Sequence, residues 1–142
     1  MSKLLRSHLK VSRIIQTTPD ALWDMLTDTI RWTQWGPTVK AVQSDSRYIR
    51  AGSTGHVKTV LGFWAPFAIT EWADGQYWSW RVSNIQATGH RIEVIDGKYC
   101  KLIFEVPLWA SPYAIICKIA ADRIARCLET GHSGTANPAN ND

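Results

Sequence analysis

The sequence predicts one α+β domain in which a curved antiparallel sheet wraps around a long C-terminal helix. Two observations lead to this fold class. Residues 39–108 contain six short stretches with strand-like alternation, separated by turn signals, which predicts an antiparallel meander. Residues 111–130 carry an apolar stripe at helical spacing. Strands followed by a helix are typical of an α+β domain, and a helix across the concave face of a curved sheet leaves space between the two.

The N-terminal elements follow from local signals. Residues 8–16 alternate, which predicts a first strand. Thr18 offers an N-cap oxygen, Pro19 suits the first helical position and Asp20 complements the positive helix end, so we expect a helix from Pro19 to about Asp28. A second short helix is expected over residues 30–34, stopped by Gly36 and Pro37.

The meander and the last helix are expected next. The predicted strands cover residues 39–44, 55–61, 66–73, 77–82, 88–95 and 98–108. Asp96-Gly97 predicts a two-residue hairpin turn, because this pair suits positive backbone angles. Ser111 and Pro112 are suited to begin the last helix, and Gly131 to end it near Thr130.

Length and composition bound the class of protein. The 142 residues, 45% of them hydrophobic and 20% charged, suffice for one domain with its own core. We expect a domain over residues 1–130 and a flexible tail over residues 131–142, which are rich in Gly, Asn and Pro. The net charge is +4, but the 16 Lys and Arg are scattered, so we expect no nucleic-acid partner.

Features that are missing from the sequence indicate where the protein is located and whether it needs a cofactor. Its longest apolar stretches are shorter than the roughly 18–20 residues that span a bilayer, so we expect no integral membrane association. The first residues carry charges where a signal peptide needs an apolar run, so we expect a soluble, cytoplasmic protein. The three cysteines lack zinc spacing and are expected to be small buried hydrophobes. We expect no metal and no cofactor.

The unusual feature of the composition is its eight tryptophans, which are more than a small domain usually needs to fill its core. We therefore expect some of these rings to line a hollow. Trp32 and Trp35 either stack on a ligand or seal the end of the core, and the sequence leaves both interpretations open. The apolar turn at residues 62–67 is an opening lip, a dimer contact or a membrane-touching loop if exposed, and a plug if buried.

The order of elements and certain residues resemble a known family. Residues 18–28 (TPDALWDMLTD), followed by Trp32 and by Trp35-Gly36-Pro37, resemble the opening of the START-like superfamily, also called SRPBCC. Within it, the chain is most similar to the polyketide cyclase/dehydrase and lipid-transport family. The stretches 52–55 (GSTG) and Gly89-His90 add to the resemblance, which covers roughly residues 8–130. It implies the helix-grip fold, with an apolar cavity between the sheet and the long helix.

Strand alternation indicates which side chains face this cavity. His90 and Ile92 share one face of their strand, Trp78 and Trp80 share a face of the preceding one, and Leu102 and Phe104 face the long helix. Glu71 faces inward only if it shares a face with Ile69; an outward position beside Arg81 is the alternative. The predicted ligand-binding residues are Trp32, Trp35, Glu71, Trp78, Trp80, His90, Ile92, Leu102, Phe104, Tyr113, Ile116 and Ala120.

The leading functional hypothesis is a non-catalytic protein that binds a small hydrophobic molecule, such as a lipid, an isoprenoid or an aromatic polyketide. One alternative is a polyketide cyclase or dehydratase in which His90 acts as acid or base. The other interpretation of His90 is a core histidine bonded to a backbone carbonyl or to Tyr113. A further alternative is a protein-interaction module whose cavity is filled by tryptophans. We expect a monomer or a homodimer.

Overall fold

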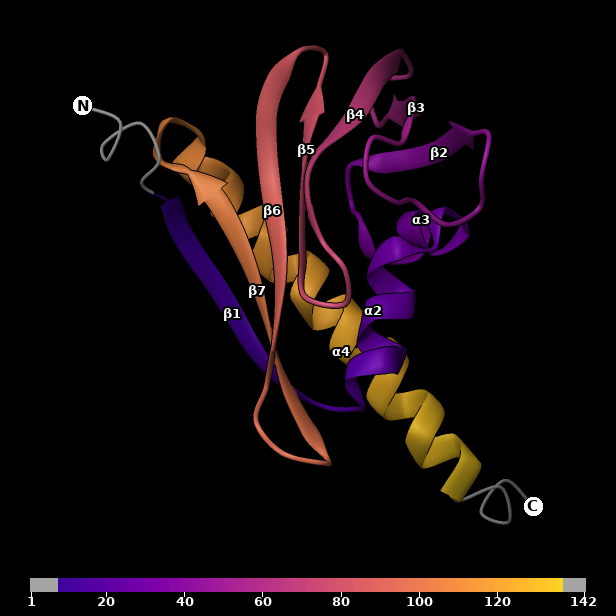
Figure 1. Ribbon diagram of the computed structural model, residues 1–142, viewed down its shortest axis with the longest axis vertical. Coiled ribbons are helices and arrows are strands. Elements are labelled where there is room, and N and C mark those ends of the chain that lie inside the picture. Colours follow the sequence, from indigo (N-terminus) through magenta and orange to yellow (C-terminus); the bar gives the residue numbers. More distant parts are fainter. Residues whose placement is uncertain (1–7, 137–142) are drawn as a thin grey trace.

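The computed structural model describes residues 8–136 and contains one seven-stranded antiparallel sheet that bends around a long helix (Figure 1). The order across the sheet is β1-β7-β6-β5-β4-β3-β2, so the first strand pairs with the last. The strands are β1 (His8–Gln16), β2 (Val39–Ser44), β3 (Thr54–Thr59), β4 (Trp64–Ala73), β5 (Tyr77–Val82), β6 (Ile85–Val94) and β7 (Tyr99–Pro107). The helices are α2 (Pro19–Thr27), α3 (Trp32–Trp35) and α4 (Ala114–Ala136), with 3-10 segments η1 (Thr29–Arg31) and η2 (Leu108–Tyr113). The predicted fold class is confirmed.

Helix α2 begins as its sequence predicts. The Thr18 hydroxyl accepts a hydrogen bond from the Ala21 N–H at 3.2 Å, Pro19 occupies the first turn and Asp20 follows it. The inner face of the helix carries Leu22 and Leu26, which have no exposed surface. The cap therefore fixes where the helix starts, and the apolar face fixes how it packs on the sheet.

The far end of α2 is held by groups distant in sequence. The last three carbonyls, those of residues 25–27, have no partner within the helix. Trp35 Nε1 donates to the first at 3.0 Å, Trp32 Nε1 to the second at 3.0 Å, and the backbone N–H of Ile49 to the third at 3.0 Å. Because a buried carbonyl without a partner is costly, these bonds fix the orientation of both indole rings.

A buried carboxylate fastens the β2–β3 connection to the same corner. The Asp28 side chain has no exposed surface, and it accepts hydrogen bonds from Arg47 Nε at 2.9 Å and Arg47 Nη2 at 2.8 Å. It also accepts from the Ile30 N–H at 3.1 Å, which caps η1. The Arg47 guanidinium lowers the pKa of the Asp28 carboxyl and outweighs the opposing effect of burial.

Two turns differ from the sequence-based expectation. The two-residue turn with positive φ lies at Ser83 and Asn84, where φ is 51° and 65° and Val82 pairs with Ile85. The hairpin predicted at Asp96-Gly97 exists, but Gly97 is not among the residues with positive φ. Instead, Asp96 Oδ1 accepts from the N–H groups of residues 98 and 99 at 2.7 and 2.9 Å, which makes a wider turn.

The long helix begins later and ends later than predicted. Residues 108–113 form η2, whose Ala110 has non-helical angles (φ −105°, ψ 24°), so the regular helix starts at Ala114 rather than Ser111. Helix α4 continues to Ala136 and does not stop at Gly131, because glycine permits a helix end without forcing one. Residues 131–136 of the predicted tail thus belong to α4, and residues 137–142 lie outside the described residues.

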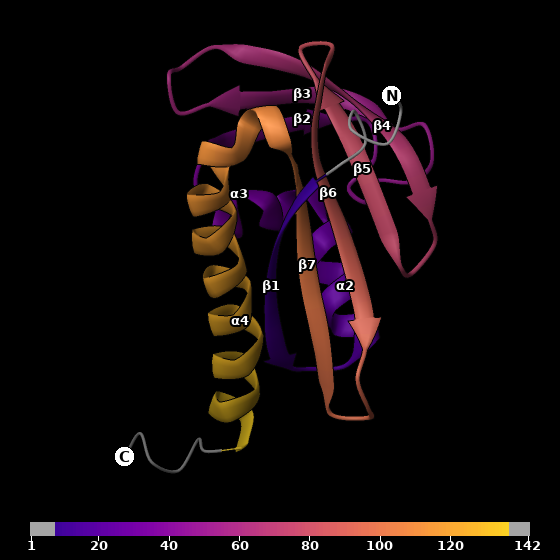
Figure 2. The same ribbon diagram turned by 90° about the vertical axis from the view of Figure 1, so that its left-hand side faces the viewer.

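Helix α4 lies alongside β1, as Figures 1 and 2 both show. Arg13 Nη1 of β1 donates to Asp122 Oδ1 at 2.7 Å, and the Gln16 N–H donates to Glu129 Oε2 at 2.9 Å. The opposite face of the helix buries residues that include Ala121 and Ile124. The first turns of the helix, beyond this contact, remain free to form one wall of a cavity.

We expect Asp28→Asn to lower the free energy of unfolding by about 1–3 kcal/mol, because the buried amide that replaces the carboxylate cannot form the two charge-assisted hydrogen bonds with Arg47. Urea denaturation at neutral pH measures this difference. Asp45→Asn, at an exposed carboxylate of the neighbouring loop, is the matched control and should change stability little. The contribution of Asp28 is present above the usual carboxyl pKa of 3.8 and is lost as the pH falls further, because its folded pKa is depressed. Equal stability of the two variants would contradict this role.

Candidate functional site

A cavity of about 360 Å³ lies between the concave face of the sheet and the first turns of α4. Its lining comes from α3 and the loop that follows it, from the first residue of β2, from β3, β5, β6 and β7, and from η2 and α4. Five of the eight tryptophans contribute to it: Trp32, Trp35, Trp78, Trp80 and Trp109. No Asp, Glu, Lys or Arg belongs to this lining in the described part of the chain. The expectation that some tryptophans line a hollow is confirmed.

The floor of the cavity is a cluster of stacked aromatic rings. Trp78 stacks on His90 with ring centroids 3.8 Å apart, and on Trp32 at 5.6 Å with 17° between the planes. Trp80 meets Trp32 edge to face at 5.3 Å. Edge-to-face and offset contacts of this kind are the arrangements that aromatic rings favour. Trp32, which the end of α2 orients, therefore packs directly on both tryptophan rings of β5.

His90 points inward, as alternation along its strand predicts, and both of its ring nitrogens are engaged. Nδ1 donates to the Trp78 carbonyl oxygen at 3.2 Å, and since a carbonyl only accepts, this nitrogen carries the proton. Nε2 then accepts from the Thr88 hydroxyl at 3.2 Å. Burial lowers the pKa of His90 to about 3. The ring is accordingly neutral at physiological pH.

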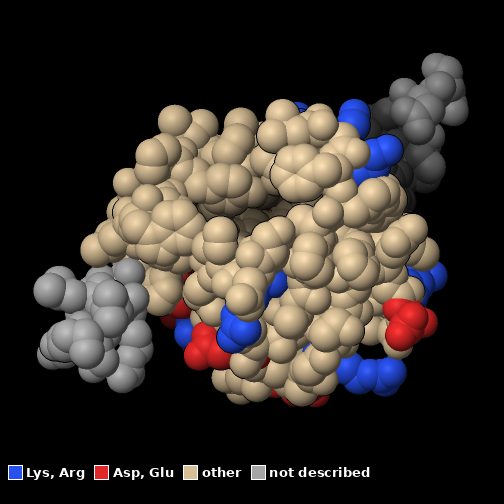
Figure 3. Space-filling view, turned by 90° about the horizontal axis from the view of Figure 1, so that it is seen from above, with Lys and Arg blue, Asp and Glu red and all other residues tan. Residues whose placement is uncertain are grey.

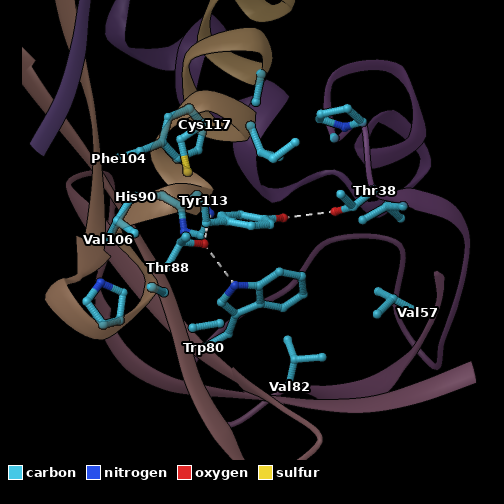
Figure 4. A pocket seen from close by; sticks show the side chains of 18 of the residues that line it. Thr38, Val57, Trp80, Val82, Thr88, His90, Phe104, Val106, Tyr113 and Cys117 are labelled. Carbon is cyan, nitrogen blue, oxygen red and sulfur yellow. Dashed lines mark hydrogen bonds between the residues drawn. The ribbon is translucent and has the colours of Figure 1, made fainter. Parts of the chain in front are cut away.

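The Thr88 hydroxyl completes this chain of hydrogen bonds. It accepts from Trp80 Nε1 at 3.1 Å while it donates to His90, as the close view of the cavity shows (Figure 4). Donors and acceptors alternate from the Trp80 indole to the Trp78 carbonyl without a charge. The polar atoms of Trp80, Thr88 and His90 are thus paired within the protein and present a neutral surface to a ligand.

A second hydrogen bond connects opposite walls of the cavity. The phenol of Tyr113, at the end of η2, extends toward Thr38 in the loop between α3 and β2, and the two hydroxyl oxygens lie 2.9 Å apart (Figure 4). Burial raises the pKa of the Tyr113 phenol, so its hydroxyl keeps its proton. The same wall carries Cys117, whose thiol pKa burial raises to about 12. A thiol with this pKa is a small apolar group here and not a nucleophile.

Two buried polar atoms have no hydrogen-bond partner among the described residues: Thr59 Oγ1 and Trp78 Nε1. Both belong to residues that line the cavity. Native proteins pair nearly all buried polar atoms, so unpaired ones mark places where the fold alone is incomplete. The hydrogen-bonding capacity that this fold leaves unused is therefore concentrated around the cavity.

Nine of the twelve predicted ligand-binding residues line the cavity, and three do not. Those that the structure brings together are Trp32, Trp35, Trp78, Trp80, His90, Phe104, Tyr113, Ile116 and Ala120. Ile92 and Leu102 are on the predicted face but lie deeper in the core. Alternation shows which face of the sheet a residue occupies, but it does not show how far along the strand the cavity extends.

Glu71 is the third and needs a correction, because its side chain is exposed on the outer face of the sheet. The pairing of β4 with β5 shifts between Ile69 and Glu71, and this irregularity interrupts the alternation that links them. Glu71 Oε1 accepts from the Ser79 hydroxyl at 2.7 Å and from the Tyr77 hydroxyl at 3.2 Å. The alternative partner expected for it, Arg81, instead donates to Asn84 at 3.4 Å.

The predicted ligand-binding set did not include several residues that line the cavity: Thr38, Val57, Thr59, Val82, Ile85, Gln86, Thr88, Val106, Trp109 and Cys117. Strand alternation also places Thr88 and Val106 on the cavity face, since each lies two positions from a predicted residue on the same strand. Alternation does not place Trp109, because this residue belongs to the irregular segment η2, which has no periodicity to analyse.

No group of three or more His, Cys, Asp or Glu side chains comes together among the described residues to hold a metal ion. None of the helices found in residues 8–136 is both long and apolar enough to cross a membrane.

The bent sheet that grips one long helix over an apolar cavity defines a START-like, or helix-grip, protein. Solved structures share this fold at low identity. XoxI from Bacillus cereus has a TM-score of 0.67 and 11% identity, over 86% of this chain and 95% of that one. The Aha1 dimer from Colwellia psychrerythraea has a TM-score of 0.68 and 12% identity, over 87% of this chain and 97% of that one. DynU16, from the dynemicin biosynthetic locus, has a TM-score of 0.62 and 17% identity, over 88% of this chain and 48% of that one.

The family follows from the sequence itself. The family model described as polyketide cyclase / dehydrase and lipid transport matches residues 6–128. The chain belongs to this family, as its resemblance indicated. No curated protein matches the sequence.

We expect the stability of the protein to decrease as the pH falls below about 6.5, because the unfolded chain binds a proton at His90 that the folded chain excludes. The free energy of unfolding should drop by about 2 kcal/mol between pH 8 and pH 5 from this residue alone. Urea denaturation across this range measures the slope.

His90→Gln removes the titrating group and should flatten the dependence in this window, whatever its effect on stability at pH 8. His56→Gln, at an exposed position on β3, is the matched control and should keep the slope of the parent protein. A slope unchanged by His90→Gln would show that the histidine is not held neutral by the fold.

Proposed function

We propose that this protein binds a small, predominantly apolar molecule, such as a lipid, an isoprenoid or an aromatic polyketide, in the cavity between the sheet and α4. The observation that carries the proposal is a cavity of about 360 Å³ without a charged side chain in its described lining. This volume is within the roughly 300–1,000 Å³ of small-molecule sites. Burying even a six-carbon chain there contributes about 5 kcal/mol before the cost of association.

The few polar groups of the cavity suit a ligand with one polar end. The chain from Trp80 through Thr88 to His90 is internally paired, so it neither needs nor strongly rewards a polar ligand group. The buried hydroxyl of Thr59 has no partner among the described residues, and a carbonyl or hydroxyl on the ligand is a suitable one. The membership of the chain in a family described by polyketide cyclisation and lipid transport supports the same class of ligand.

The cyclase or dehydratase alternative receives less support from the geometry. An acid or base that works near neutral pH needs a pKa near that pH and a free ring nitrogen. His90 has a pKa lowered to about 3 and engages both nitrogens within the protein. These contacts favour a structural role, in which His90 supports Trp78 and Thr88 in the cavity floor.

The alternative of a cavity filled by tryptophans is also less well supported, because five of these rings surround a space that remains open. We propose a cytoplasmic protein that is a monomer or a homodimer; the structural neighbour Aha1 is described as a dimer. Native mass spectrometry of gently purified protein reports the oligomeric state. It also reveals any co-purified molecule as a mass that is lost on denaturation.

Ile116→Phe should weaken binding of N-phenyl-naphthylamine, an uncharged apolar fluorophore, by at least about tenfold, the equivalent of about 1.4 kcal/mol. Ile116 lines the cavity, so the larger ring occupies the space that the fluorophore needs. The measurement is energy transfer from the cavity tryptophans to the fluorophore during titration.

Ile115→Phe is the matched control, since the adjacent side chain is 70% exposed and outside the cavity lining. It should leave the affinity for the fluorophore unchanged. Thermal denaturation of both variants verifies that each is folded. Equal affinity of the two variants, or absence of binding to the parent protein and to a panel of lipids and aromatic molecules, would contradict the proposal.

A further inference from the structure

Exposed apolar side chains gather at the end of the molecule where the cavity opens. We call six of them the apolar rim: Leu61 and Phe63 in the β3–β4 turn, Ile85 after the β5–β6 turn, Leu108 and Trp109 in η2, and Ile115 in α4. Leu61 is 82% exposed and Trp109 is 68% exposed. Figures 1 and 2 place these segments at the same upper end of the fold.

The rim is connected with the cavity. Ile85 and Trp109 belong both to the rim and to the cavity lining, and Thr59, which also lines the cavity, precedes the β3–β4 turn. Figure 3 looks onto this end and shows a hollow surrounded by atoms of neither acidic nor basic residues, with charged side chains farther out. An exposed apolar surface around an opening of this kind is typical of an interaction site rather than of ordinary solvent-exposed surface.

Charge distinguishes between the occupants of such a surface. Residues 54–70, 76–92 and 106–121, which carry the rim, contain none of the 12 Asp and Glu of the chain. They do contain Lys58 and Arg81, as well as Arg91 and Lys118, which pair with Glu105 and Asp122 just outside these segments. Lys58 lies in β3 next to the turn of Leu61, and Arg81 lies one residue before the end of β5, beside the turn that precedes Ile85.

We propose that the apolar rim docks this protein on an anionic lipid surface, with the rim side chains at the boundary of headgroups and acyl chains. Lys58 and Arg81 contact the negative headgroups. A second copy of the chain is a poorer occupant, because twofold pairing through the rim brings the cations of both copies together without a carboxylate from these segments. Docking concerns the surface of a bilayer, and it does not depend on which molecule the cavity holds.

Vesicle flotation with the full chain tests the proposal. The protein should float with mixed phosphatidylcholine–phosphatidylglycerol vesicles, and much less with pure phosphatidylcholine vesicles. The double variant Leu61→Ser with Phe63→Ser should reduce this binding by at least about tenfold, because it removes two apolar groups from the interface. Neither residue lines the cavity, so binding of N-phenyl-naphthylamine should be retained.

Matched controls separate the rim from general apolar and basic surface. Val94→Ser changes an exposed apolar residue at the opposite end of β6 from Ile85, and it should leave flotation unchanged. Lys58→Gln with Arg81→Gln should abolish the preference for anionic vesicles, whereas Lys98→Gln with Lys101→Gln should retain it. Thermal denaturation verifies that each variant is folded.

Each remaining outcome would overturn docking. These are absence of flotation with either vesicle type, flotation unaffected by Leu61→Ser with Phe63→Ser, or a dimer that this variant dissociates, which would assign the rim to a second copy. Ile116→Phe distinguishes this proposal from the cavity function, because it should impair binding of the fluorophore without changing flotation. Loss of both properties in Ile116→Phe would mean that docking requires an unaltered cavity, and it would contradict their independence.

Discussion

The site depends on three backbone carbonyls at the end of α2 that the helix itself leaves unpaired. These groups lie in the interior, where an unpaired carbonyl is costly, and the indole N–H groups of Trp32 and Trp35 pair with two of them. The third pairs with the backbone of Ile49, in the connection that the Asp28–Arg47 bonds hold in place. One helix end thereby determines where two large rings stand. Trp32 packs against Trp78 and Trp80. Trp35 packs against His90 and Phe104.

Polar atoms of the sheet that lie in the cavity floor also need hydrogen-bond partners. Trp80, Thr88 and His90 carry polar atoms into an apolar interior, and they pair in a chain that needs neither a charge nor a solvent molecule. The neutral state of His90 is a consequence of this arrangement, since protonation would place an uncompensated charge among stacked rings. Discrimination between ligands at such a floor rests on shape and contact area far more than on ionic attraction.

Much of the fold could be predicted from the sequence because its signals are local. Alternation located β1, β2 and β5 at their observed limits, and capping residues located the start of α2. The inward position of His90 follows from the same alternation. The prediction of Glu71 as a cavity residue was wrong, because the irregular pairing that displaces it depends on the neighbouring strand. Gly131 does not end α4, because glycine permits a helix end without forcing one.

The remaining misses concern depth and irregular backbone. Ile92 and Leu102 lie on the predicted face of the sheet. Their distance from the cavity depends on where the helix crosses the strands, and sequence periodicity does not contain this information. The two-residue turn at Ser83-Asn84 has no glycine, so a rule based on Asp-Gly pairs does not predict its positive φ values. Trp109 belongs to η2, where no period exists to indicate a face.

The floor of the cavity and its α4 wall are built differently, and they therefore differ in how well they tolerate substitutions. The floor is made of rings and hydroxyls that hold one another, so a change there disturbs several partners at once. The α4 wall contributes Ile116, Cys117 and Ala120, for which the described structure records no side-chain hydrogen bond. Substitutions on the helix can therefore change the shape of the cavity while the hydrogen bonds of the floor persist. The fold itself tolerates wide differences in sequence, since the structural neighbours named above are only 11–17% identical to this chain.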